Sequence, residues 1–197
     1  TYYFLARAAA SGSYAETISQ GVAITTPKKS VNGIEIIDQP DNLSYTSGQT
    51  LDLSGLSVKV DYNDNTSETL TGESGKLTVA PAQGTVLTVA EHHGKAITIS
   101  YGGKTAETNA LTVGRAEQAL LSITGAPGQI YKGSSFTLQT SGGSGDGAVT
   151  WSAVSGPVTV DADGTVTVTD TGEFQIKAVK AETVEYDQAE AVITLTA

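Results

Sequence analysis

Oxygen-bearing side chains crowd one short stretch of the chain. Asp61, Asn63, Asp64 and Asn65 lie close together, and carboxylate and amide oxygens at this spacing could hold Ca²⁺, which takes about six to eight oxygen ligands. The same residue types favour a tight turn, because Asn and Asp side chains hydrogen-bond to the nearby backbone. We expect a turn and retain Asp61, Asn63 and Asp64 as calcium candidates. Residues 161–164 begin like a calcium loop but lack its later glutamate, so a turn is again favoured.

Side chains that could support catalysis are sparse. His92 and His93 are the only imidazoles, and adjacent residues of a strand point to opposite faces, so we expect a solvated turn rather than a shared metal. No Gly-x-Ser-x-Gly elbow occurs. Residues 142–147 are glycine-rich but lack the Lys-Ser/Thr ending of a phosphate loop, which predicts a flexible connection. The glutamates are scattered, so we expect no catalytic residue, no cofactor and no enzyme activity.

The composition excludes several classes of partner. The chain has 197 residues, a formal net charge of -10 and no cysteine. An acidic protein is repelled by nucleic acids and anionic membranes, so we expect neither as a partner. Without cysteine there is no disulfide framework and no zinc knuckle. No apolar run approaches the roughly 18 residues of a membrane-spanning helix, so we expect no membrane insertion in this chain.

The hydrophobic pattern predicts strands joined by tight turns. Residues 56–61 alternate apolar and polar side chains, which is the period of a half-buried strand. Gly102 and Gly103 separate two further strand patterns, and glycine accepts the positive φ angles of hairpin turns. The sequence therefore predicts an all-β fold of sandwich modules with almost no helix. Inward positions in these patterns are predicted for Trp151, Tyr62, Tyr101 and Phe136; for Trp151 a sugar-stacking role is the alternative.

An internal repeat indicates how the chain is divided. Tyr2, Phe4, Ala6 and Tyr14 match Phe174, Ile176, Ala178 and Tyr186 at a constant offset. We expect residues 1–28 to be the last two strands of a module whose earlier strands precede Thr1, because two strands alone cannot bury a core. Two complete modules are predicted at residues 29–114 and 115–197.

Two segments resemble known modules. Residues 45–56, continuing through Val58, Val60 and Tyr62, together with residues 99–105 and 111–113, are similar to bacterial immunoglobulin-like (Big) domains. Residues 131–133, 136–138, 142–145, 149–151 and 164–166 resemble, in their order, a related repeat of Gram-positive surface proteins. The resemblance implies tandem immunoglobulin-like β-sandwich modules in a secreted or cell-wall-anchored bacterial protein. It implies no ligand, because such folds host many roles.

Three functions are compatible with these observations. The first is a non-catalytic structural spacer or stalk that presents a functional domain away from the cell wall. The alternative is an adhesin or a module that binds a host protein or carbohydrate through loops at residues 72–75, 91–94 and 141–147. The third is assembly through an exposed sheet edge that accepts a strand from a second copy. We otherwise expect a monomer.

Overall fold

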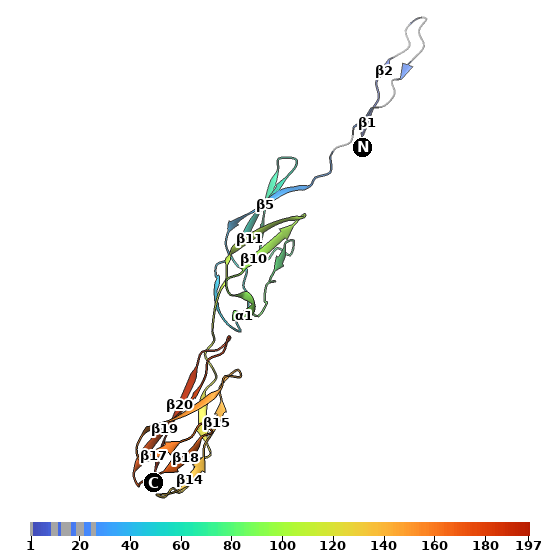
Figure 1. Ribbon diagram of the computed structural model, residues 1–197. Coiled ribbons are helices and arrows are strands. Elements are labelled where there is room, and N and C mark those ends of the chain that lie inside the picture. Colours follow the sequence, from blue (N-terminus) through green and yellow to red (C-terminus); the bar gives the residue numbers. More distant parts are fainter. Residues whose placement is uncertain (1, 9–11, 13–16, 19–21, 25–26) are drawn as a thin grey trace.

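The computed structural model describes residues 2–8, 12, 17–18, 22–24 and 27–197. Tyr14, which the internal repeat singled out, lies outside the described residues. The all-β prediction is confirmed (Figure 1). The strands are β1 (Tyr2–Phe4), β2 (Arg7–Ala8), β3 (Thr17–Ile18), β4 (Val22–Ile24), β5 (Val31–Asp38), β6 (Ser44–Thr46), β7 (Ser57–Tyr62), β8 (Ser67–Thr71), β9 (Thr78–Ala80), β10 (Ala96–Tyr101), β11 (Lys104–Ala110), β12 (Thr112–Gly114), β13 (Leu121–Thr124), β14 (Ser135–Thr137), β15 (Gln139–Gly142), β16 (Val149–Ser155), β17 (Val158–Val160), β18 (Thr165–Val168), β19 (Glu173–Lys180) and β20 (Ala189–Thr196), and the described helix is α1 (Val89–His92).

Strands β5 to β12 form a first sandwich. One sheet has the order β5-β7-β8 and the other β11-β10-β9, while β12 pairs with β6 in parallel. Residues of β7 alternate as the sequence predicts: Val58 and Val60 are fully buried, whereas Ser57 and Lys59 are partly exposed. The predicted turn at Gly102 and Gly103 closes the β10–β11 hairpin.

The core of the first sandwich is aliphatic. Its buried members come from both sheets and from the connections between them, and the cluster consists of Tyr45, Leu51, Leu53, Leu56, Val58, Leu87, Ile97, Ile99, Leu111 and Val113. Thr108 is the buried polar residue of the described chain. Its hydroxyl oxygen accepts from the Ile97 backbone N–H at 2.9 Å and donates to the carbonyl of Asn109 at 2.8 Å. The contact lies where the register of the β10–β11 pair shifts. Thr108 therefore accepts the hydrogen bond of a backbone N–H, that of Ile97, which has no strand partner at this irregularity.

Strands β13 to β20 form a second sandwich of immunoglobulin-like topology. One sheet has the order β16-β19-β20, and the other consists of the pair β13-β15 and the three strands β14-β18-β17. β14 and β15 are consecutive parts of one strand, which pairs with β18 through its first part and with β13 through its second. Counted as one strand, they give sheets of four and three strands, which is the arrangement of the immunoglobulin fold. Its core holds Phe174 and Ile176 from β19 against Leu138 and Val166 from the facing sheet.

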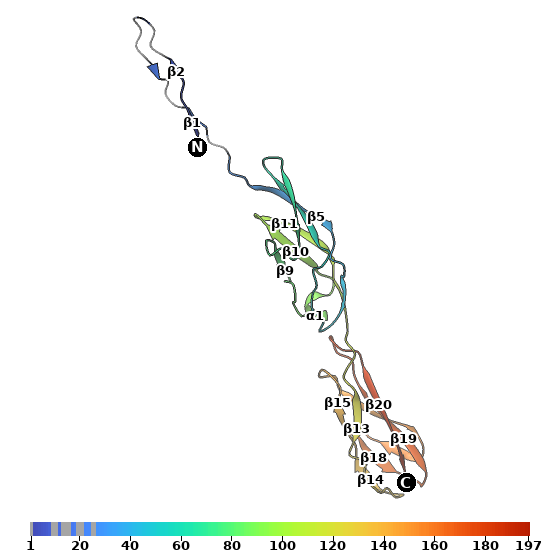
Figure 2. The ribbon, with the colours of Figure 1, turned by 180° about the vertical axis from the view of Figure 1, so that it is seen from behind.

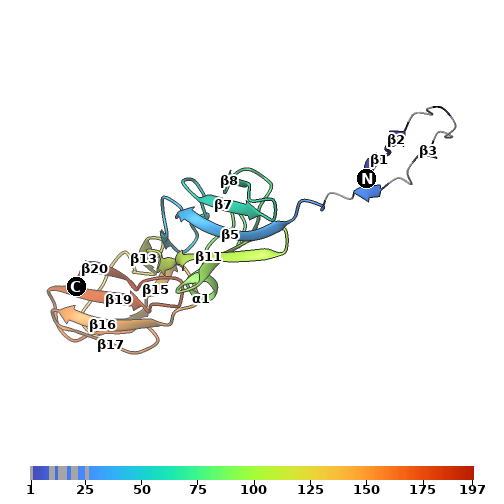
Figure 3. The same cartoon turned by 90° about the horizontal axis from the view of Figure 1, so that it is seen from above.

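The first described residues form antiparallel pairs. Strand β1 pairs with β4, with Tyr2 opposite Ile24, and β2 pairs with β3 (Figure 3). The sequence predicts two strands in this region. The assignment of residues 1–28 to an incomplete preceding module stays a prediction.

The two sandwiches follow one another end to end. Figures 1 and 2 show the first sandwich joined to the second through a narrow waist near α1, with β19 ending and β20 beginning close to it. Within the described residues, no helix is long and apolar enough to cross a membrane.

Candidate functional site

The waist between the sandwiches is held first by the backbone. After β12, the Ala116 N–H donates to the carbonyl of Glu185 at 2.8 Å, and the Asp187 N–H donates to the carbonyl of Ala116 at 2.9 Å. Ala116 thereby makes a parallel bridge with Tyr186 in the β19–β20 loop. The connecting segment is therefore paired with the second sandwich rather than left as a free linker.

The carboxylate of Glu185 crosses from the second sandwich to the first. It accepts hydrogen bonds from the Ser47 hydroxyl, from the Val89 N–H at 2.8 Å and from the Ala90 N–H at 3.0 Å. Val89 and Ala90 open α1, and the first N–H groups of a helix have no acceptor within the helix. Thr88, the N-cap, accepts from the Glu91 N–H at 3.3 Å. Glu185 thus supplies, from the neighbouring sandwich, acceptors that this helical turn otherwise lacks.

The electrostatics of this contact favour the ionised carboxylate. The hydrogen bond from Ser47 is the largest cause that lowers the pKa of Glu185. The backbone N–H groups of Ala90 and Val89 lower the pKa further, while desolvation opposes them. Hydrogen bonds to an ionised acceptor are stronger than neutral ones. The joint is therefore a charge-assisted contact that depends on the ionisation of Glu185.

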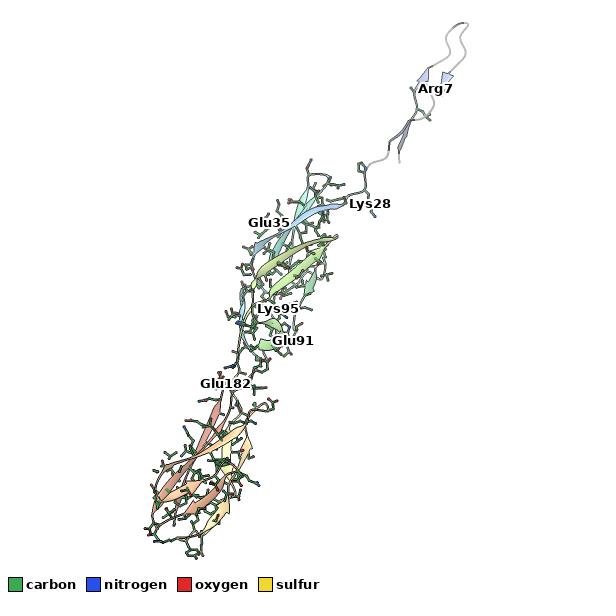
Figure 4. All side chains as sticks on the ribbon, viewed as in Figure 1. Arg7, Lys28, Glu35, Glu91, Lys95 and Glu182 are labelled. Carbon is green, nitrogen blue, oxygen red and sulfur yellow. The ribbon has the colours of Figure 1, made fainter. Side chains whose placement is uncertain are left out.

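A second contact across the waist is more exposed. The guanidinium Nη1 of Arg115 lies 2.9 Å from Glu182 Oε2, and both side chains are well exposed. Exposed ion pairs contribute little to stability, so we assign the joint mainly to Glu185. Figure 4 shows Glu182 at the end of the second sandwich that faces Glu91 and Lys95 of the first.

The loop that carries Glu185 is anchored by Gln118. The Gln118 amide Nε2 donates to the carbonyls of Ala181 at 3.0 Å and Asp187 at 2.7 Å, on either side of Glu185. Its Oε1 accepts from the Ser144 N–H at 3.1 Å. Ser144 belongs to the glycine-rich residues 142–147, which the sequence predicts to be a flexible connection. The structure instead holds this stretch by a hydrogen bond to Gln118, in the segment that leads into the second sandwich. Close approach requires Gly147, since a Cβ there would lie 2.1 Å from the carbonyl oxygen of Ala181.

The calcium candidates have separate partners. Asp61 lies 3.0 Å from the Lys59 ammonium, and Asn63 bonds to the segment that precedes β5. Asp64 accepts from the hydroxyl of Thr66 at 2.6 Å, and its pKa is lowered chiefly by that residue. Asn65 has a φ of 61°, as a tight turn requires. Among the described residues, no three His, Cys, Asp or Glu side chains are grouped to hold a metal ion.

The histidines have structural contacts. His92 lies in α1, where the sequence predicts a turn, and its Nδ1 accepts from the Thr88 N–H at 3.1 Å. The Nδ1 of His93 accepts from the Val113 N–H at 3.2 Å. His92 ends a single helical turn that Thr88 caps, whereas His93 is exposed in the turn before Gly94, as the sequence predicts, and the two rings bond to different segments.

The residues predicted to be inward-facing fall into two groups. Trp151 and Phe136 are partly buried and pack against the core of the second sandwich. Tyr62 and Tyr101 belong to no core cluster and are only half-buried. They lie at the ends of β7 and β10, and their hydroxyl oxygens are 3.5 Å apart. The alternation of the sequence gives the face of a residue but not whether the opposite sheet reaches it.

Comparisons with known proteins place the chain in no family. No protein-family model matches it, and no curated protein matches it. Among solved structures, immunoglobulin domains 1–4 of Sidekick-1 align with 92% of this chain at 11% identity and a TM-score of 0.31. The chain spans about half (54%) of the length of that four-domain structure.

Proposed function

We propose that this chain is a non-catalytic spacer, a stalk of a secreted or surface-anchored bacterial protein that holds a functional domain away from the cell wall. The observation that carries the proposal is the Glu185 joint. A stalk must keep its modules in line, and here one module supplies the hydrogen-bond acceptors for the helical turn of the next.

The sequence resemblance to bacterial immunoglobulin-like domains supports the exported, Gram-positive setting of this proposal. The acidic surface supports it as well, because net charge favours solubility and discourages self-association. The pairing of the connecting segment with the β19–β20 loop supports a short, stiff connection, which favours an extended string of domains.

Small-angle X-ray scattering of the chain tests the spacer function. We expect a maximum dimension of at least the summed lengths of the two sandwiches, since residues 1–28 precede them, and a scattering profile that does not change with protein concentration. A compact particle, in which the sandwiches pack side by side, would contradict the proposal.

A further inference from the structure

A pocket opens at the end of the first sandwich that lies away from the Glu185 joint. Its volume is about 490 Å³, which falls in the usual range of about 300–1,000 Å³ for small-ligand sites. It is lined by Lys28, Lys29, Ser30, Val31, Tyr62 and Tyr101. Figure 4 labels Lys28 at this end of the sandwich and Lys95 near the opposite end.

The wall of the pocket that precedes β5 is fixed by Asn63. The Asn63 side chain accepts from the Ser30 N–H at 3.0 Å and donates to the carbonyl of Lys28 at 3.1 Å. The Asn63 backbone N–H donates to the carbonyl of Ser30 at 3.0 Å. These bonds hold residues 28–30 against the β7–β8 turn, so the pocket is built by the fold.

Two tyrosines form the floor. The Tyr62 hydroxyl donates to Glu68, which raises the pKa of Tyr62, and lies 3.5 Å from the Tyr101 hydroxyl. Gly102 allows this arrangement, since a Cβ there would lie 2.3 Å from Val31 Cγ2, with a φ of 55°. The hairpin can therefore approach β5 closely and bring the Tyr101 hydroxyl beside that of Tyr62. The floor offers both apolar ring surface and hydroxyl groups.

The rim of the pocket carries positive charge in an otherwise acidic protein. The Lys29 ammonium is occupied: it lies 4.0 Å from the centroid of the Tyr62 ring, 3.5 Å from Asp64 and 2.7 Å from the Thr66 hydroxyl. Lys28 differs, because within the part of the chain that the structure describes no side chain pairs with its ammonium group. The pocket is therefore lined by one cation without a partner among the described residues, together with two aromatic, hydroxyl-bearing side chains.

We propose that this pocket binds a pyranose sugar that carries a carboxylate. The apolar C–H face of the sugar would lie on the Tyr101 ring, its hydroxyl groups would bond to the tyrosine hydroxyls and Ser30, and its carboxylate would pair with Lys28. Each part of such a ligand has a matching group in the pocket. A neutral sugar would leave the Lys28 charge unused, and a purely apolar ligand would leave the hydroxyl groups unpaired.

Titration of methyl glucuronoside into the isotope-labelled chain, followed by NMR, tests this site. Methyl glucoside is the matched probe, since it differs only in having a neutral hydroxymethyl group where the glucuronoside has the carboxylate. We expect shifts confined to residues 28–31, 62 and 101–102, and an affinity for the glucuronoside about five- to tenfold higher than for the glucoside, as for one exposed charge-assisted contact.

Variants separate the contributions of the site. Lys28→Gln should weaken glucuronoside binding about five- to tenfold and leave glucoside binding unchanged. Tyr101→Ala should weaken both sugars, and Tyr101→Phe, which keeps the ring, should retain most of the affinity. Lys95→Gln is the control and should bind like the unaltered chain. The proposal is overturned by an absence of shifts at millimolar sugar, by equal affinities for the two sugars, or by a glutamate-rich peptide that shifts the same residues at lower concentration.

Discussion

Removal of the Glu185 carboxylate should uncouple the two sandwiches while both stay folded. Glu185→Ala deletes the acceptors for Ser47, Val89 and Ala90. Hydrogen bonds to a charged group contribute about 1.5–3 kcal/mol each when buried. Because this loop is partly open to water, we expect a loss of about 1–2 kcal/mol for the whole contact. That loss lowers the ratio of docked to undocked molecules by roughly 5- to 30-fold.

Backbone ¹⁵N relaxation measures this coupling directly. In the unaltered chain the sandwiches should tumble as one elongated particle, with the same long correlation time. In Glu185→Ala each sandwich should show a shorter, separate correlation time, while its own chemical shifts away from the waist persist. Glu182→Ala, which removes a carboxylate from the same loop and the exposed Arg115 ion pair, is the matched control and should leave the tumbling unchanged. Identical relaxation in Glu185→Ala and the unaltered chain would refute this reasoning.

The same contact should respond to pH. The pKa of docked Glu185 lies below its ordinary value of 4.5. Docking is therefore fully favoured above that value and is lost as the pH falls through it toward the lower pKa of the docked state. Acidification of the unaltered chain should reproduce the Glu185→Ala relaxation, and Glu185→Ala itself should show no such pH dependence in this range. A joint that loosens as the pH rises would contradict the predicted direction of the pH dependence.

Three further outcomes follow from the cores and the turns. Phe174→Ala should destabilise the second sandwich by about 3–5 kcal/mol in urea unfolding followed by the fluorescence of Trp151, because Phe174 is fully buried; Val192→Ala, at a half-exposed site, is the control. Thr108→Val should cost the first sandwich about 1–3 kcal/mol by leaving the Ile97 N–H unpaired, whereas Thr108→Ser should restore most of the stability; equal effects of both variants in thermal unfolding would argue against the hydrogen bond. Calcium should not change the melting temperature, because Asp64 is already satisfied by Thr66 and Lys29; a rise that is abolished by Asp64→Asn would show a calcium site instead.

Local signals in the sequence were sufficient for the strands and the tight turns. A few neighbouring residues are enough to predict each of these elements. The alternation around Val58 and Val60 predicts strand β7, and the paired glycines at 102 and 103 predict the β10–β11 turn. The partial exposure of Tyr62 and Tyr101 was not predictable in this way, because it depends on how far the opposite sheet extends. The helical turn at residues 89–92 was missed because it is too short to show a period, although Thr88 is a recognisable cap.

The joint and the pocket lie beyond local patterns for a different reason. Glu185 meets Ser47 across 138 positions of sequence, and nothing around either residue marks the pairing. Gln118 likewise acts through carbonyl groups on a loop more than sixty positions away. In the pocket, the sequence marks Asn63 only as a possible calcium ligand. Its hydrogen bonds to residues 28–30 become visible only when the β7–β8 turn and the segment before β5 are placed side by side.

Pulsed electron-spin distance measurement between the two sandwiches tests the central claim most directly. The chain has no cysteine, so single cysteines at Thr69 and Thr196, both exposed, can be labelled without background. A fixed, extended joint predicts one narrow distribution of long distances that matches the structure and broadens in Glu185→Ala. A broad distribution in the unaltered chain, or a short distance between the labels, would contradict it.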